Sequence, residues 1–214
     1  MRKTISLILN FIIVVFGIIG TFIMFTFKGS GTGLTSSGIQ NFKFFTVLSN
    51  ELCVLIALAY IVFRFMKKSF PVALKLMATA AVGLTFIVVA AFLAPIYPDL
   101  NLYEGGNLWF HLIIPLTSMI EFLILENPDD KKIPFRYTFF SASFALVYGL
   151  GYLINILING VGQWPDTNDW YGFLNWGYPI GICIFAFIVF MNWLIAVILR
   201  LLNIVVSKRL KVKE

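Results

Sequence analysis

The chain contains 214 residues, of which 60% are apolar and only 12% are charged, with a net charge of +6 and a mean hydropathy of +0.92. Soluble domains carry about 25% charged residues, so this composition excludes an ordinary water-soluble globule. The positive charge does not indicate nucleic-acid binding, because the basic residues lie in short clusters beside apolar segments, where they set membrane topology and contact anionic headgroups.

Six apolar segments of about 20 residues follow one another, and each is long enough to cross a bilayer as a helix. They cover about 5–27, 43–63, 74–94, 107–125, 135–158 and 178–200, and the last can continue to about Val206. Breakers rich in Gly, Pro, Asn, Asp or Lys separate them. The sequence therefore predicts an all-α integral membrane protein, with residues 1–214 forming a single domain built as a bundle of six transmembrane helices.

The first segment has the basic start of a signal peptide, Met1-Arg2-Lys3, but runs on from Ile5 to about Phe27 without a small-residue cleavage site. It is predicted to be a retained first helix. Cys53 and Cys183 both lie within apolar spans and are predicted to be small core residues rather than a disulfide or metal pair. One histidine and two separated cysteines cannot supply a zinc site, so neither a metal nor a cofactor is expected.

The basic residues also predict the orientation of the bundle. Fourteen of the sixteen Lys and Arg residues lie near the two chain ends, or in or beside the segments that join span two to span three and span four to span five. Lys28 and Lys43 are the exceptions. Basic residues accumulate on the cytoplasmic side of membrane proteins. The sequence thus predicts a multi-pass protein of the cell membrane with both termini in the cytoplasm, in which spans two, four and six begin at the outer face.

The start of span two carries a stripe of polar residues. At 100° per residue, Thr46, Ser49, Asn50 and Cys53 share one helix face, whereas Glu51 lies about 140° from Thr46 and is expected to point elsewhere. Small polar side chains often join neighbouring spans by hydrogen bonds. The stripe is therefore consistent either with helix–helix contacts or with a polar site in the outer leaflet.

The chain's only histidine, His111, lies about one turn into span four, at nearly the depth expected for Thr46. Pro115 and Ser118, at i+4 and i+7, share its face. Pro115 frees a backbone carbonyl and favours a kink. By itself, the histidine fits a structural hydrogen bond or interface position as well as a functional one.

Two further features lie at opposite ends of the bundle. The loop over 159–177 is longer than a turn requires; its aromatic residues fit an aromatic belt, or a lid with Trp164, Trp170 or Tyr171 facing the bundle. Near the cytoplasmic end, Glu121 is expected to reach water beside Lys131 or Lys132, with no basic partner inside the membrane.

Two motifs resemble those of a known family. Phe44-Phe45-Thr46-Val47-Leu48-Ser49-Asn50 resembles a Phe-Thr-x-x-Ser-Asn signature, and His111-Leu112-Ile113-Ile114-Pro115 resembles a His-x-x-x-Pro signature. With 170–174 and 177–179, they make the chain similar to the androgen-induced-gene and ADTRP-like family of small six-span proteins, and the bacterial relatives in particular.

The resemblance implies hydrolysis of fatty-acid esters inside the membrane. By motif, the nucleophile is Thr46 and the general base is His111, with Asn50 or a backbone N–H stabilising the oxyanion. The supporting or substrate-binding residues are then expected to be Ser49, Asn50, Glu51, Pro115, Ser118, Trp170 and Tyr171. The implied partners are membrane lipids and a lipid-ester substrate; the oligomeric state stays open.

The alternative function is binding or transport of a small molecule or lipid without hydrolysis. Transport requires polar residues through the inner leaflet, whereas the cytoplasmic halves of spans two and four are mostly apolar, with Glu121 as the main exception. This pattern favours a site closed at its cytoplasmic end. A purely structural or accessory role is the third possibility.

Overall fold

The structure is a computed structural model that describes residues 2–26, 38–96, 98–99, 101–125, 132–163 and 167–211. The described regular structure is all helical, and six helical stretches are long and apolar enough to cross a membrane. The predicted six-helix multi-pass membrane protein is therefore confirmed at this level.

Four of the stretches are single α-helices, and in each of the other two a π-helical turn joins two α-helices. The elements are α1 (Arg2–Thr26), the 3-10 helix η1 (Gly38–Lys43), α2 (Phe45–Phe65), α3 (Val72–Val88), the π-helix η2 (Val89–Leu93), α4 (Ala94–Ile96), α5 (Gly106–Leu108), the π-helix η3 (Trp109–Ile113), α6 (Ile114–Ile124), α7 (Arg136–Asn159) and α8 (Tyr178–Lys211). Thus α3–η2–α4 form one stretch, and α5–η3–α6 another. The predicted spans match these bounds within about three residues, except that α8 continues to Lys211.

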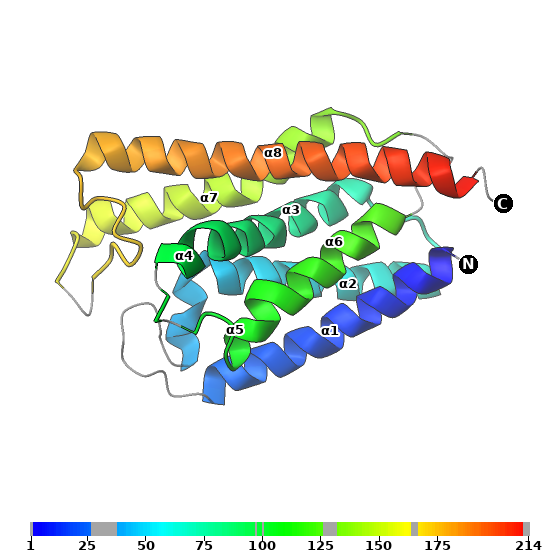
Figure 1. Cartoon of the computed structure of the whole chain (residues 1–214), viewed down its shortest axis with the longest axis horizontal. Helices are drawn as coiled ribbons and strands as arrows, with labels where there is room; N and C mark the ends of the chain where they lie inside the picture. Colours follow the sequence, from blue (N-terminus) through cyan, green and yellow to red (C-terminus); the bar gives the residue numbers. More distant parts are fainter. Residues whose placement is uncertain are drawn as a thin grey trace.

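The centre of the bundle is α3, which packs against α2, α6, α7 and α8. Its buried stretch includes Ala78, Ala80, Ala81 and Gly83, and such small residues let neighbouring helices approach closely in a membrane. In Figure 1, α7 and α8 run along one side of α3 while α1 runs along the other. Large apolar side chains such as Phe22 and Val147 stay exposed on the outer helices, as expected of surfaces that face lipid.

The two ends of the bundle differ. Figure 1 shows that α1 begins and α8 ends at the same end of the bundle, as six crossings require. We call this the terminal end. At the opposite end, the loop end, lie the first residues of α2, α5 and α8 and the segment before Tyr178.

Each of the two π-turns directly precedes a proline. Ala94 and Ile114 donate their N–H groups five residues back, to the carbonyls of Val89 and Trp109, and each is followed by a proline, Pro95 or Pro115. A proline ring in a regular α-helix clashes with the carbonyl four residues earlier. The wider π-turn relieves this clash, and at Pro115 the carbonyl concerned is that of His111.

The two cysteines have different environments. Cys53 is buried on α2, as predicted, whereas Cys183 is exposed on α8. The prediction of a core position for Cys183 was wrong because α8 presents this face outward, to lipid. Both thiols are free.

The crossing of α7 and α8 generates a stability prediction. A Cβ atom added at Gly149 would overlap the Phe185 ring, whereas one added at Gly151 would meet no atom within 4 Å. Alanine is intrinsically better than glycine in a helix by about 1 kcal/mol, but overpacking costs about 1–3 kcal/mol. We expect Gly149→Ala to lower the melting temperature in detergent and Gly151→Ala, two residues away, to leave it unchanged or raise it.

Intrinsic tryptophan fluorescence of the purified variants during heating would measure both effects. Phe185→Ala should remove the penalty of Gly149→Ala when the two are combined. Equal melting temperatures for the two single alanine variants would contradict the close α7–α8 contact.

Candidate functional site

The polar stripe of α2 lies at the loop end, as predicted, and its side chains contact α3, η3 and α6. Ser49 and Asn50 are fully buried and Thr46 is half-buried. The Ser49 hydroxyl lies 3.1 Å from the Thr85 hydroxyl of α3 and also 3.1 Å from the Thr46 carbonyl. The stripe thus joins α2 to α3, in agreement with the interpretation that it forms helix–helix contacts.

Asn50 links the start of α2 to the π-turn that carries His111. Its amide nitrogen donates to the carbonyl oxygen of Thr46 at 2.8 Å and to that of Phe110 at 2.9 Å. Two bonds that meet at one nitrogen place these carbonyl oxygens no more than 5.7 Å apart. The backbones next to both predicted catalytic residues are therefore held close together.

Pro115 explains why Phe110 needs this donor. In the π-helical turn, the N–H of Ile114 bonds to the carbonyl of Trp109, five residues back. The same spacing would pair the N–H of residue 115 with the carbonyl of Phe110, but residue 115 is a proline and has no N–H. A carbonyl inside a membrane must find another donor, and Asn50 supplies it. The asparagine of the first motif thus compensates for the proline of the second.

His111 is 7% exposed. Its Nδ1 lies 2.6 Å from the carbonyl oxygen of Leu102, and because a carbonyl can only accept, Nδ1 is the donor. In a neutral imidazole the other nitrogen, Nε2, then carries the lone pair. This is the tautomer that a general base requires.

Thr46 and His111 are not hydrogen-bonded to each other. Within the described ranges, the Thr46 hydroxyl has no hydrogen-bond partner, and the His111 ring is bonded at Nδ1 alone. The structure brings their backbones together through Asn50 but does not form the nucleophile–base contact. The Thr46 hydroxyl and His111 Nε2 both remain available to a ligand.

The other predicted supporting residues separate into different places. Glu51 accepts a hydrogen bond from Thr21 of α1, so it points away from Thr46, as its helical position predicted. Ser118 lies deeper, 2.9 Å from the Thr79 hydroxyl and 3.4 Å from the Cys53 sulfur. Although it shares a helix with His111, it belongs to a polar contact between α2, α3 and α6.

The segment before α8 packs onto the bundle. The hydroxyl of Tyr171 accepts a hydrogen bond from the N–H of Phe45, the first residue of α2, at 2.8 Å. Trp170 and Tyr171 pack against the apolar cluster that contains Phe44 and Phe110. These two residues thus face the bundle, as predicted for a lid. Trp164, the third residue named in that prediction, lies outside the described residues.

Asp169 fixes the shape of this segment. Its carboxylate accepts hydrogen bonds from the N–H groups of Phe173 and Leu174, each at 2.9 Å, and from the hydroxyl of Tyr152. Burial raises the pKa of the neighbouring Tyr171 phenol, so this side chain stays neutral at physiological pH. The neutral phenol contacts the start of α2, where Thr46 lies.

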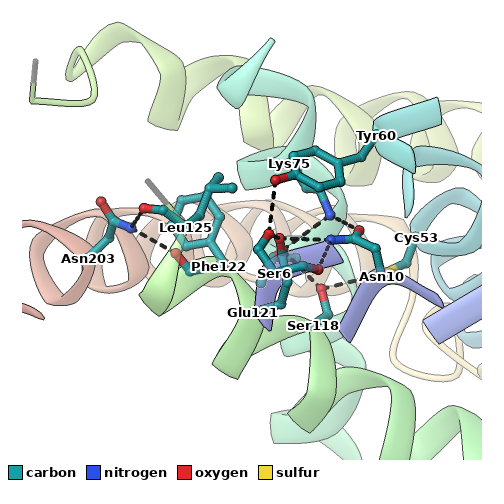
Figure 2. Close-up of polar contacts among 11 residues, drawn as sticks. Ser6, Asn10, Cys53, Tyr60, Lys75, Ser118, Glu121, Phe122, Leu125 and Asn203 are labelled. Atoms are coloured by element: carbon teal, nitrogen blue, oxygen red, sulfur yellow. Dashed lines mark hydrogen bonds and ion pairs between the residues drawn. The ribbon is translucent and has the colours of Figure 1, made fainter. Parts of the chain in front are cut away.

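The structure corrects the prediction for Glu121, and Figure 2 shows its surroundings. Glu121 is fully buried and forms an ion pair with Lys75 of α3, whose Nζ lies 3.1 Å from Glu121 Oε2. Glu121 was predicted to have no basic partner inside the membrane. This expectation was wrong, because Lys75, the fourth residue of α3, turns its side chain into the bundle and has only 3% of its surface exposed.

Four helices contribute to this cluster. From α1, the Ser6 hydroxyl and the Asn10 amide donate to Glu121 Oε1 at 2.5 and 2.9 Å. Lys75 also donates to Asn10 Oδ1 and lies 4.6 Å from the centre of the Tyr60 ring of α2. Ser6 Oγ also lies 3.0 Å from the Tyr60 hydroxyl. We call Ser6, Asn10, Tyr60, Lys75 and Glu121 the ionic cluster.

The cytoplasmic halves of spans two and four are mostly apolar, but α1 and α3 add polar side chains to the terminal half of the bundle. Polar side chains continue from Ser49 and Thr85 through the Cys53–Thr79–Ser118 contact to the ionic cluster. The signal in the sequence was a pair of polar residues one turn apart in an apolar helix, Ser6 and Asn10. That spacing puts both side chains on one face.

The described residues contain no group of three or more His, Cys, Asp or Glu side chains that could hold a metal ion. Comparisons with protein-family models, with curated proteins and with solved structures each returned no match.

The link between Asn50 and Pro115 generates a second prediction. Asn50→Leu removes the donors to two carbonyls, and hydrogen bonds inside membranes contribute about 0.6 kcal/mol on average and at most about 1.7 kcal/mol. Pro115→Ala supplies a new N–H that can reach the Phe110 carbonyl. We expect Asn50→Leu to destabilise the protein less in the Pro115→Ala background than in the wild type.

A double-mutant cycle of unfolding free energies in detergent would measure this coupling. Asn192→Leu is the matched control, because Asn192 is also buried and donates to a carbonyl, that of Ala80, in another part of the bundle. Additive effects of Asn50→Leu and Pro115→Ala, like those expected for Asn192→Leu and Pro115→Ala, would refute the compensation.

Proposed function

We propose that this protein is a membrane-embedded hydrolase of lipid esters, with Thr46 as nucleophile and His111 as general base. The observation that carries the proposal is the bond from His111 Nδ1 to the Leu102 carbonyl, because it leaves Nε2 as a proton acceptor. The Thr46 hydroxyl supports it, because it has no hydrogen-bond partner within the described part of the chain and lies in the segment that Asn50 holds beside Phe110. The two motifs that resemble the androgen-induced-gene and ADTRP-like family point to the same residues.

The proposed reaction has two steps. His111 Nε2 takes the Thr46 hydroxyl proton as the oxygen attacks the ester carbonyl, and the imidazolium then returns the proton to the departing alcohol. This leaves an acyl–Thr46 ester, which a water molecule hydrolyses with His111 again acting as base. Catalytic hydrogen bonds are often absent without substrate and form in the substrate complex, so the Thr46–His111 contact is proposed to form on binding.

The oxyanion is assigned to backbone donors. Both amide hydrogens of Asn50 are already bonded to carbonyls, which leaves none for a substrate. At the start of α2 the Phe45 N–H is bonded to Tyr171, whereas the Thr46 and Val47 N–H groups belong to the first turn, which has no intrahelical acceptors. The positive end of the helix dipole favours an anion there, and one oxyanion donor typically contributes about 3 kcal/mol.

Access and orientation complete the proposal. An ester enters sideways from the bilayer, and Trp170 and Tyr171 cover the start of α2 from the loop end. The excess of basic residues at the terminal end supports cytoplasmic termini in the cell membrane, with the candidate site in the outer leaflet. The proposed partners are thus membrane lipids and an ester substrate.

A second candidate function is binding or transport of a small molecule or lipid without hydrolysis. One specific observation favours it: polar side chains run from Ser49 to the ionic cluster, across most of the bundle. Transport requires such residues at all depths, and buried charges inside membranes often mark solute or ion routes.

Replacement of the two proposed catalytic residues separates these functions. Thr46→Ala and His111→Ala should each abolish ester hydrolysis, because a nucleophile and its base act as a unit. Thr46→Ser keeps a hydroxyl and should retain part of the activity and the labelling by a fluorophosphonate probe. Turnover of a panel of lipid esters in liposomes, with mapping of the labelled residue, provides the measurement.

Thr117→Ala is the matched control, since it removes a threonine hydroxyl that bonds to the Ile113 carbonyl of its own helical stretch and should preserve hydrolysis. Equal hydrolysis by wild type and both alanine variants, or labelling at a residue other than Thr46, would exclude the mechanism. An inert wild type that binds or moves a solute would establish the second candidate.

The proposed orientation has its own test. Single cysteines introduced at Lys68 and at Asn159, in a Cys53→Ala/Cys183→Ala background, mark opposite ends of the bundle. In intact cells, a membrane-impermeant maleimide should label position 159 and reach position 68 only after lysis. The reverse pattern would invert the topology.

A further inference from the structure

The ionic cluster holds the two most deeply buried charged side chains among the described residues. Glu121 is 0% exposed and Lys75 is 3% exposed, and a charge inside a membrane is retained only with a partner and usually at a functional site. A buried ion pair is weak evidence for stability, because a well-packed apolar pair often serves as well. The proposed hydrolase does not use either residue.

The Lys75 ammonium occupies the position of a cation held by oxygen atoms. Glu121 Oε2 is 3.1 Å from Nζ, and Asn10 Oδ1 accepts a hydrogen bond from it. The Ser6 hydroxyl bonds to the same carboxylate, and the Tyr60 hydroxyl bonds to Ser6. Carboxylate, amide and hydroxyl oxygens are hard donors of the kind that bind hard cations.

Charge balance requires one positive charge beside Glu121 but does not fix which cation carries it. If the ammonium leaves and a free monovalent cation enters, the cluster stays neutral. Replacement by no cation at all would leave a buried carboxylate unpaired, at a cost of several kcal/mol. Exchange of one monovalent cation for another therefore keeps the charge of the cluster balanced.

Lys75 is placed to make this exchange. It is the fourth residue of α3, which begins at Val72, so its Cα lies only about 4.5 Å along the helix from the terminal end. Long lysine side chains near a helix end extend to the membrane interface. The loop that precedes α3 is exposed around Lys68, which places water close to this end of the helix.

We propose that the ionic cluster is a binding site for a monovalent cation, with Na⁺ as the probe ion, and that Lys75 is a tethered cation competing for it. Glu121 and Asn10 bind whichever cation is present, and Ser6 and Tyr60 hold the carboxylate in place. In the state described above, the ammonium fills the site. When Na⁺ binds, Lys75 extends to the terminal end. This site is independent of the proposed hydrolase.

The wild-type protein allows a direct test. Purified protein in detergent is treated with an amine-acylating reagent in NaCl or in N-methylglucamine chloride of equal ionic strength, and labelled peptides are quantified by mass spectrometry. By mass action, acylation of Lys75 should rise roughly in proportion to Na⁺ below saturation. Lys68, which is exposed in either state, should react equally in both salts. Equal labelling of Lys75 in the two salts would overturn the proposal.

Substitutions give a second readout. In Lys75→Ala the competitor is gone, so Na⁺ should raise the melting temperature relative to N-methylglucamine, and the rise should grow with the logarithm of the Na⁺ concentration. This Na⁺-dependent rise in melting temperature should be absent in the double variant Lys75→Ala/Glu121→Gln. In the control variant Lys68→Ala, compared at the same salt concentrations, it should be no larger than in the wild type. A Lys75→Ala protein indifferent to Na⁺, or one that responds equally without Glu121, would show that the pair only joins helices.

Discussion

The hydrogen bond from Asn50 to the Phe110 carbonyl is the contact on which the loop end of the bundle depends. It exists because a membrane gives an unpaired carbonyl no water to bond, and Pro115 removes the backbone N–H that would otherwise serve. The same proline widens the helix into the π-turn that carries His111. The absence of a backbone N–H at Pro115 therefore determines the backbone conformation at His111, the position of the Asn50 side chain and the distance between α2 and η3.

The helices themselves follow from hydrophobicity. Runs of about 20 apolar residues have few alternatives to a membrane-spanning helix, so all six stretches were predictable nearly to their ends. The error at α8, predicted to end near 200 or at most near Val206 but extending to Lys211, has a physical reason. A helix that leaves the membrane needs no apolar residues to continue, and Asn203 still bonds to the end of α6, 2.7 Å from the Phe122 carbonyl, so hydropathy alone cannot locate that end.

The candidate site was predictable only where its residues are close in sequence. The stripe of α2 and the pair His111 and Pro115 follow from helical periodicity. The partner of Glu121 does not, because Lys75 is 46 positions away and lies beside a basic loop that resembles a topology signal. Similarly, the Leu102 carbonyl that fixes the histidine tautomer comes from an irregular segment with no periodicity. Contacts across helices depend on packing, which a pattern along one helix does not contain.

The two polar centres solve the burial of polar groups in different ways. At the loop end, Asn50 satisfies backbone groups, and the Thr46 hydroxyl and His111 Nε2 have no hydrogen-bond partner among the residues that the structure describes. In the ionic cluster, the side chains bond mainly to one another. The Glu121 carboxylate accepts hydrogen bonds from Ser6 and Asn10 and pairs with the Lys75 ammonium, and Tyr60 bonds to Ser6. A centre with unsatisfied groups is suited to binding a ligand as the chain stands. A centre that is already satisfied can bind one only by exchange for a group it holds, and Lys75, on a flexible four-carbon stem near a helix end, is the member of the cluster best placed to leave.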